Sequence, residues 1–107
     1  MYDVYDVLLS DEAEKDLYDI ADYISEQLQN PLSAVKTVDE IEKTLTKRLE
    51  IFPNSYPIHS YLESLGVEYR RTIIDNFTAF YIVDDIGEVV TITHIIYNKR
   101  DVASLIK

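Results

Sequence analysis

The sequence predicts an α+β domain: an N-terminal strand, an antiparallel pair of helices, a three-stranded antiparallel meander and a short C-terminal helix. Two observations carry this prediction. Between residues 13 and 49, apolar residues recur at helical spacing in two stripes with one break between them. After residue 67 the chain becomes dense in Ile, Val, Thr, Phe and Tyr, with turn-forming residues between three such segments. A chain of 107 residues supports one hydrophobic core, so residues 1–107 are expected to form a single domain.

The first elements expected are a strand over Tyr2–Leu9 and a helix that follows it. The strand segment is rich in β-branched and aromatic residues. Ser10 is a good N-cap, and three acidic residues follow in the first turn, where the helix dipole favours negative charge. The apolar face of this helix consists of Ala13, Leu17, Ile20, Ala21, Ile24 and Leu28.

A second helix is expected to begin at Asn30, with Pro31 at the first helical position, where its missing N–H costs nothing. It should end at Phe52, because Pro53 disfavours helical geometry in the residue before it. The break between the two helices is only a residue or two, which predicts an antiparallel hairpin. The second apolar stripe consists of Ala34 or Val35, Val38, Ile41, Leu45 and Leu49.

The segment Pro53–Gly66 has turn residues, two prolines and no periodicity, so it is expected to be a loop. Three strands should follow, over Glu68–Ile74, Phe77–Val83 and Glu88–Tyr97. Turn-forming residues at 75–76 and 84–87 separate them at hairpin spacing.

The last ten residues are compatible with a short helix. Within 98–107, Val102, Leu105 and Ile106 share a helical face.

The formal net charge of −10 is concentrated near the N-terminus. Residues 1–26 hold nine acidic residues and one basic residue, Lys15. The simplest interpretation is a solvated helix face, and the sharper one is a docking surface for a basic segment of a partner. Generic nucleic-acid binding is disfavoured, because phosphates would be repelled.

Composition excludes several classes of site and compartment. The absence of cysteine removes disulfides, thiolate zinc sites and cysteine nucleophiles. No signal peptide or membrane-spanning apolar run is present, so a cytoplasmic protein without membrane contact is expected. No metal-binding or phosphate-binding motif occurs, and we expect neither metal nor cofactor.

Histidine chemistry is equally weak in the sequence. His59 and His94 have no third ligand at a recognisable spacing. His94 alternates with Ile92 and Ile96, which favours a half-buried position on a sheet face over a role as ligand or base.

One constellation in the C-terminal half can carry chemistry. Arg70 and Arg71 begin the first meander strand, and Tyr97, Lys99 and Arg100 follow the last one. Adjacent residues of a strand point to opposite faces, so only one of the two arginines can join a given site. Tyr97 with Arg100 offers an aromatic ring and a guanidinium for a carboxylate, a phosphate or an unstacked base. The alternative is that the arginines pair with neighbouring acids and orient the sheet edge.

The ordered set of residues resembles the ParE/RelE superfamily of toxins from type II toxin–antitoxin systems, in its ParE-like branch. The opening strand and helix are similar at Ser10, Ala13, Asp16, Leu17, Ile20, Tyr23 and Ile24. The meander is similar at Arg70 or Arg71, Asn76, Phe80, Tyr81, Val83, Asp84, Ile92, Ile95, Tyr97, Arg100 and Asp101. The resemblance covers nearly the whole chain, with Pro53–Gly66 as its variable part.

This resemblance implies a growth-inhibiting toxin that a cognate antitoxin neutralises by wrapping around it, as a homodimer or as a heterotetramer with the antitoxin. ParE-like members bind DNA gyrase, whereas RelE-like members cut mRNA on the ribosome with several basic residues and a tyrosine or histidine. For the binding role, the candidate contacts with target or antitoxin are Arg71, Tyr81, Tyr97, Arg100 and Asp101. For a nuclease, the candidates are Arg70, His94, Tyr97 and Arg100.

The RelE-like catalytic set is poorly kept. Thr72 and Thr78 stand where basic side chains are expected, and the final segment has no tyrosine. Cleavage of RNA needs converging cations around a phosphate, and a chain of net charge −10 supplies few. We therefore expect a non-enzymatic gyrase-binding toxin, with a ribosome-dependent nuclease or a degenerate antitoxin-binding module as alternatives.

Overall fold

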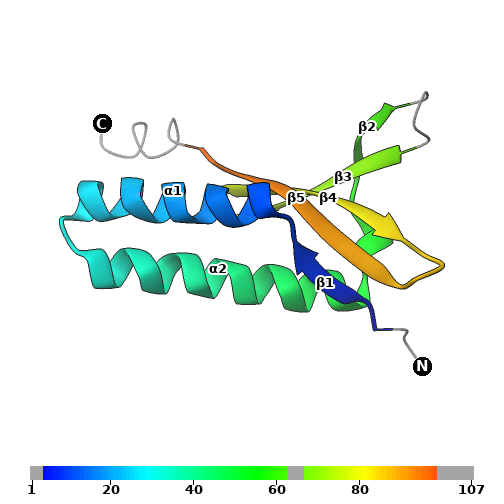
Figure 1. Cartoon of the computed structure of the whole chain (residues 1–107), viewed down its shortest axis with the longest axis horizontal. Coiled ribbons are helices and arrows are strands. Elements are labelled where there is room, and N and C mark those ends of the chain that lie inside the picture. The colour runs from blue at the N-terminus through cyan, green and yellow to red at the C-terminus, as the bar shows by residue number, and fades with distance from the viewer. Residues whose placement is uncertain (1–3, 63–66, 99–107) are drawn as a thin grey trace.

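A computed structural model describes residues 4–62 and 67–98. The helical elements are α1 (Asp11–Leu28), α2 (Pro31–Ile51) and a short 3₁₀ helix, η1 (Pro53–Ser55). The strands are β1 (Asp6–Leu9), β2 (Ile58–Leu62), β3 (Val67–Ile74), β4 (Phe77–Asp84) and β5 (Val89–Tyr97). They form one sheet in the order β1-β5-β4-β3-β2, in which β1 runs parallel to β5 and the other neighbours are antiparallel. The α+β class, the helical hairpin and the three-stranded meander are confirmed (Figure 1).

Both helices begin where their capping residues stand. The Ser10 side chain accepts a hydrogen bond from the Ala13 N–H (3.1 Å), and the Asn30 side chain accepts one from the Ser33 N–H (3.2 Å). Between the helices, Gln29 adopts a left-handed conformation (φ 53°), which reverses the chain within two residues. The helices consequently run side by side in antiparallel directions (Figure 1).

The apolar stripes of both helices pack against one face of the sheet, and this interface is the core. The core side chains are Ala13, Leu17, Ile20, Ile24, Ala34, Val38, Ile41, Leu45, Leu49, Ile74, Phe77, Ala79, Tyr81, Val90, Ile92 and Ile95. The end of α2 is fixed to β3 by Arg48, whose guanidinium donates to the Thr72 hydroxyl (2.8 Å) and the Ile73 carbonyl (3.0 Å). Thr72 is the one buried polar residue of the described core, so Arg48 satisfies it.

The prediction of a loop over Pro53–Gly66 is wrong for part of that segment. Its first residues form η1, and Ile58–Leu62 form β2 at the edge of the sheet. β2 pairs with β3, with a register shift between Ile58 and Ser60. An isolated five-residue segment has no periodicity to reveal a strand; the free edge of β3 supplies the hydrogen-bonding partners that make it one.

The remaining predicted bounds agree closely, with one exception at the start of the chain. The strand expected over Tyr2–Leu9 comprises only Asp6–Leu9 among the described residues, because Asp6 already stands opposite Val89, the first residue of β5. The short helix expected within 98–107 falls almost entirely on residues 99–107, which lie outside the described residues.

The turn between β4 and β5 joins distant parts of the chain through Asp85. Its carboxylate accepts hydrogen bonds from the Tyr5 hydroxyl and the Asn54 side-chain amide, both at 2.7 Å. Both bonds lower the pKa of Asp85, and the bond from Tyr5 has the larger effect. In the same turn, a Cβ at position 87 would lie 2.7 Å from the Asp84 carboxylate, so replacing Gly87 would require that side chain to shift.

Candidate functional site

Arg70 and Arg71 point to opposite faces of β3, as the sequence predicted. Arg70 is half-buried on the helix-covered side, where it donates to the Tyr56 carbonyl (2.7 Å) and lies 3.8 Å from Glu68. Arg71 is exposed on the other side. Arg70 therefore holds the segment before β2 in place, and Arg71 is the one of the two arginines that is exposed to solvent.

The face of the sheet turned away from the helices presents a broad apolar surface. Leu8, Ile73 and Ile96 are each more than half exposed on it. Across three strands, Arg71 stands opposite Phe80 and Phe80 opposite His94, so a cation and an imidazole flank an aromatic ring. We call this surface the open sheet face; its residues are Leu8, Tyr69, Arg71, Ile73, Thr78, Phe80, Ile82, Thr91, His94 and Ile96.

A bulge in β5 puts His94 on that face. Phe80 pairs with His94 and Tyr81 with Ile92, so Thr93 is an extra residue between them. The bulge reverses the alternation: Ile92 is buried, but His94 is exposed instead of half-buried as the sequence alternation predicted.

The start of α1 is clamped onto this bulge. The Ser10 hydroxyl donates to the Thr93 carbonyl (2.9 Å), and the Asp16 carboxylate accepts from the Ile95 N–H (2.9 Å). Asp16 also lies 3.4 Å from Nδ1 of His94. Ser10 and Asp16, two residues of the family-like opening, thus act as structural ties between helix and strand.

Tyr81 is not a surface contact, which corrects its assignment as a target-binding or antitoxin-binding residue. Its side chain is 0% exposed, and its hydroxyl donates to the Pro53 carbonyl (2.7 Å). Burial raises the pKa of Tyr81, so the phenol stays protonated and remains a donor. Strand alternation places the residue on the core side with Phe77 and Ala79, where it anchors η1.

Tyr97 lies at the far end of the core, in a hollow that we call the end pocket. Its ring centroid is 4.9 Å from that of Phe77 and 5.9 Å from that of Tyr23. Burial raises the pKa of Tyr97, Tyr23 adds to this, and a hydrogen bond with the Asn76 side chain opposes it. The pocket has a volume of about 490 Å³; its lining is Ile24, Gln27, Leu28, Thr37, Glu40, Ile41, Thr44, Ile74, Asp75, Asn76, Phe77 and Tyr97.

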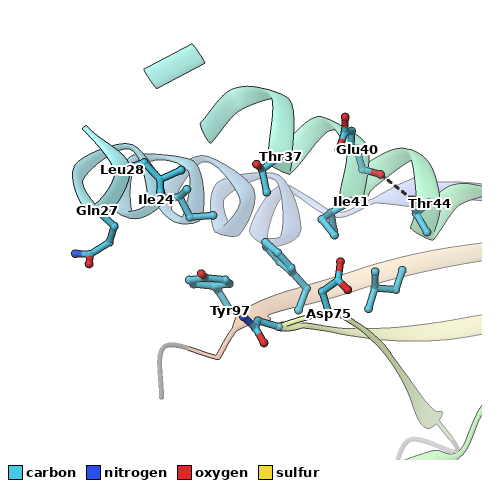
Figure 2. A pocket seen from close by; sticks show the side chains of 12 residues that line it. Ile24, Gln27, Leu28, Thr37, Glu40, Ile41, Thr44, Asp75 and Tyr97 are labelled. Atoms are coloured by element: carbon cyan, nitrogen blue, oxygen red, sulfur yellow. Dashed lines mark hydrogen bonds between the residues drawn. The ribbon is translucent and has the colours of Figure 1, made fainter. Parts of the chain in front are cut away.

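The end pocket is open between the two helices and the β3–β4 turn. Figure 2 shows Tyr97 below Ile24 and Leu28 of α1, with Asp75 on the side of Ile41 and Thr44 of α2. Its lining combines apolar and aromatic side chains with six polar ones, Gln27, Thr37, Glu40, Thr44, Asp75 and Asn76. Tyr97 lines this pocket, while Arg100 and Asp101 lie outside the described residues.

Of the candidate nuclease residues, the fold does not bring together the three that lie within the described ranges, Arg70, His94 and Tyr97. Arg70 lies on the helix side, His94 on the open sheet face and Tyr97 in the end pocket. Thr72, where the resemblance would place a cation, is buried against Arg48. Within residues 4–62 and 67–98 there is also no group of three or more potential metal ligands and no helix able to cross a membrane.

Comparisons with known proteins agree with this architecture. Residues 7–102 match the family model described as the ParE toxin of the type II toxin–antitoxin system parDE. The fold is similar to a chain of the chromosomal ParDE system from P. aeruginosa, with a TM-score of 0.69 and 20% identity, over 88% of this chain and 96% of that one. It is also similar to a chain of the RelBE2 toxin–antitoxin complex from Mycobacterium tuberculosis, with a TM-score of 0.60 and 17% identity, over 88% and 91%.

A search of curated protein sequences gave no match. At these identities the two structures establish the fold alone, whereas the family model spans most of the sequence. The ordered residues of α1, the meander and the connecting turns lie within the matched range. The chain belongs to the ParE toxin family of type II toxin–antitoxin systems.

Proposed function

We propose that this protein stops growth by binding a macromolecular target, DNA gyrase, and that a cognate antitoxin neutralises it. The target follows from the ParE-like resemblance, and the antitoxin from membership of a toxin–antitoxin family. The observation that supports a binding role, as opposed to a cleaving one, is the separation of Arg70, His94 and Tyr97, the candidate catalytic residues within the described ranges.

A nuclease needs its cations and its proton-transfer group around one phosphate. Here the Arg70 guanidinium is held by a carbonyl on the helix side, while His94 is on the opposite face of the sheet. Tyr97 contacts two aromatic rings at the end of the core. Because Arg70, His94 and Tyr97 lie in three different surroundings, they cannot act together on one phosphate. This favours a binding role over RNA cleavage.

The open sheet face and the end pocket are the surfaces that we assign to binding. The first is wide, apolar and carries Arg71; the second is a hollow beside Tyr97. Exposed apolar patches of this kind mark protein interaction sites. An antitoxin segment that wraps the chain around the end of β5 can contact both and thereby exclude the target.

The gyrase proposal is tested by supercoiling of relaxed plasmid with purified gyrase and increasing amounts of the protein. We expect inhibition by the native chain and its loss in Ile73→Asp, which puts a charge on the open sheet face. The matched control is Ile86→Asp, because Ile86 lies in the β4–β5 turn and is 98% exposed. This variant should inhibit supercoiling as strongly as the native chain. Undiminished supercoiling at saturating native protein would exclude gyrase as the target.

Two further measurements separate the alternatives. Primer extension on translating mRNA would show codon-phased cuts if the protein were a ribosome-dependent nuclease. For a gyrase-binding toxin, we expect the transcripts to stay intact during growth arrest. Induction in cells should arrest growth, and co-expression with a cognate antitoxin should restore it. Normal growth on induction would instead indicate a degenerate antitoxin-binding module.

A further inference from the structure

The end pocket has an apolar floor and an exposed apolar residue at its mouth. Ile24, Ile41, Ile74 and Phe77 line it and are each less than a tenth exposed, whereas Leu28 is 56% exposed. Its volume of about 490 Å³ lies in the range of pockets that enclose a small ligand or several side chains. Apolar side chains that enter the pocket leave water and cover Leu28 as well, and this burial favours binding.

The end pocket also favours positive charge. Glu40 and Asp75 belong to its lining, and no basic residue of the described ranges does. Figure 2 shows the Asp75 side chain directed toward α2. Gln27 and Leu28 are the last residues of α1, and the partial negative charge at the carbonyl end of this helix is not offset by a basic residue in its last turn. A suitable occupant therefore combines apolar and basic residues.

The part of the sequence that follows β5 has this composition. Residues 99–107, which we call the basic segment, hold three basic residues and one acidic residue, a net charge of +2 in a chain of net charge −10. They also include Val102, Leu105 and Ile106, whose spacing is that of one helical face. The basic segment thus offers both kinds of side chain that the end pocket favours.

The chain leaves β5 at the wall of the end pocket. Tyr97, the last residue of β5, belongs to the lining, and so does Asn76. The Asn98 N–H donates to the Asn76 carbonyl (2.8 Å), which holds the chain beside the β3–β4 turn. The nine residues of the basic segment can span at most about 30 Å extended or about 13 Å as a helix, so they start close enough to reach the pocket in either form.

We propose that the basic segment docks in the end pocket of its own chain. Its apolar side chains contact Leu28 and the buried floor, and its basic side chains face Asp75 and Glu40. The docking itself does not depend on the cellular target. It bears on the proposed function in one respect: any partner that uses the end pocket competes with the basic segment for it.

Covalent attachment selects this occupant over a second copy of the chain or a free ligand. A segment tethered beside its site has an effective concentration on the order of 1 mM, whereas a second copy at micromolar concentration supplies far less. Two chains of net charge −10 also repel each other. The pocket is therefore expected to be filled from within the same molecule.

A paired-cysteine experiment on the full chain tests the docking, because the native sequence contains no cysteine. Leu28→Cys is combined in turn with Val102→Cys, Leu105→Cys or Ile106→Cys. The matched control replaces Leu8 instead of Leu28, since Leu8 is a leucine of nearly equal exposure (55%) on the open sheet face. A disulfide requires its two Cα atoms to lie within about 7 Å, so its rate of formation under mild oxidation reports proximity.

At least one of the position-28 pairs should form an intramolecular disulfide at least about tenfold faster than the corresponding position-8 pair. Equal rates for both sets would overturn the proposal, because the basic segment would then have no preferred site. Disulfides formed mainly between two chains, seen as dimers on a non-reducing gel, would assign the pocket to a second copy and would likewise overturn it.

Thiol labelling measures how much of the free protein is docked. Docking in about nine of ten molecules should slow the labelling of Leu28→Cys about tenfold, relative to the same variant with Leu105→Asp and Ile106→Asp added. Labelling of Leu8→Cys should not respond to these two substitutions. Unchanged labelling at position 28 would show that the pocket stays open in the free chain, available to a partner or a cationic small molecule, and would overturn the proposal.

The charge contribution is tested in the same assay. Asp75→Asn should raise the labelling rate of Leu28→Cys, whereas Asp19→Asn, the same change at an exposed position of α1, should not. An equal response to both would overturn the role of Asp75 in the docking. Circular dichroism confirms that each variant is folded. None of these measurements contains gyrase or an antitoxin, so their outcome is independent of the supercoiling assay.

Discussion

Replacing Tyr81 by phenylalanine should destabilise the protein without changing any binding surface. The substitution removes only the hydroxyl that donates to the Pro53 carbonyl at 2.7 Å, and the ring still fills its place in the core. Pro53 is itself buried, so its carbonyl has little access to water as a substitute donor. The loss therefore comes from one hydrogen bond and one unsatisfied acceptor.

The magnitude follows from those two terms. Leaving a buried acceptor unsatisfied costs about 1–3 kcal/mol, and we expect about 2 kcal/mol for this carbonyl. Because 1 kcal/mol shifts Tm by about 4–8 °C in a domain of this size, the variant should melt about 8–16 °C lower. The matched control is Tyr18→Phe, whose hydroxyl is on an exposed side chain; its stability should change by less than about 0.5 kcal/mol.

Urea unfolding followed by circular dichroism gives the free energy of unfolding for all three proteins. The pH dependence offers a second check on the role of Tyr81. Burial raises its pKa above the ordinary value of about 10, so its stabilising effect is complete below pH 10 and decreases as the pH rises further. Tyr81→Phe should reduce that alkaline loss. A variant as stable as the native chain, with an unaltered alkaline profile, would refute the structural role.

Three further predictions concern the ties between α1, the β5 bulge and the β4–β5 turn. Asp16→Ala should cost about 1.5–3 kcal/mol in urea unfolding, because the Ile95 N–H loses a charged acceptor, while the exposed control Asp19→Ala should change stability by less than about 0.5 kcal/mol. Ser10→Ala removes both a helix cap and a contact with the bulge, and a loss of about 1–2 kcal/mol is expected by the same measurement; a loss below about 0.3 kcal/mol would contradict the clamp. The lowered pKa of Asp85 means that its stabilising effect is present above pH about 4 and is lost as the pH falls through its folded-state pKa. Asp85→Asn should therefore make the acid side of the stability profile shallower, and an unchanged profile would count against this role.

Local signals in the sequence predicted most of the candidate site's framework but not its contacts. Ser10 and Asn30 cap helices because their side chains bond to N–H groups three residues away, and such bonds depend on neighbours in sequence alone. The opposite orientation of Arg70 and Arg71 also follows from the pleat of a single strand. The sequence could not tell which arginine would be reachable, since this depends on which face the helices cover.

By itself, then, the sequence determined the class of fold, the helical hairpin, the meander and the acidity of α1. The tertiary structure decided the rest, because strand pairing and burial depend on residues far apart in the chain. β2 exists because β3 has a free edge, and His94 is exposed because Thr93 is accommodated as an extra residue opposite β4. Tyr81, which the family resemblance suggested as a contact with the target or the antitoxin, is buried because its side of the strand faces the helices. The end pocket likewise exists only once α1, α2 and the β3–β4 turn are brought together around Tyr97.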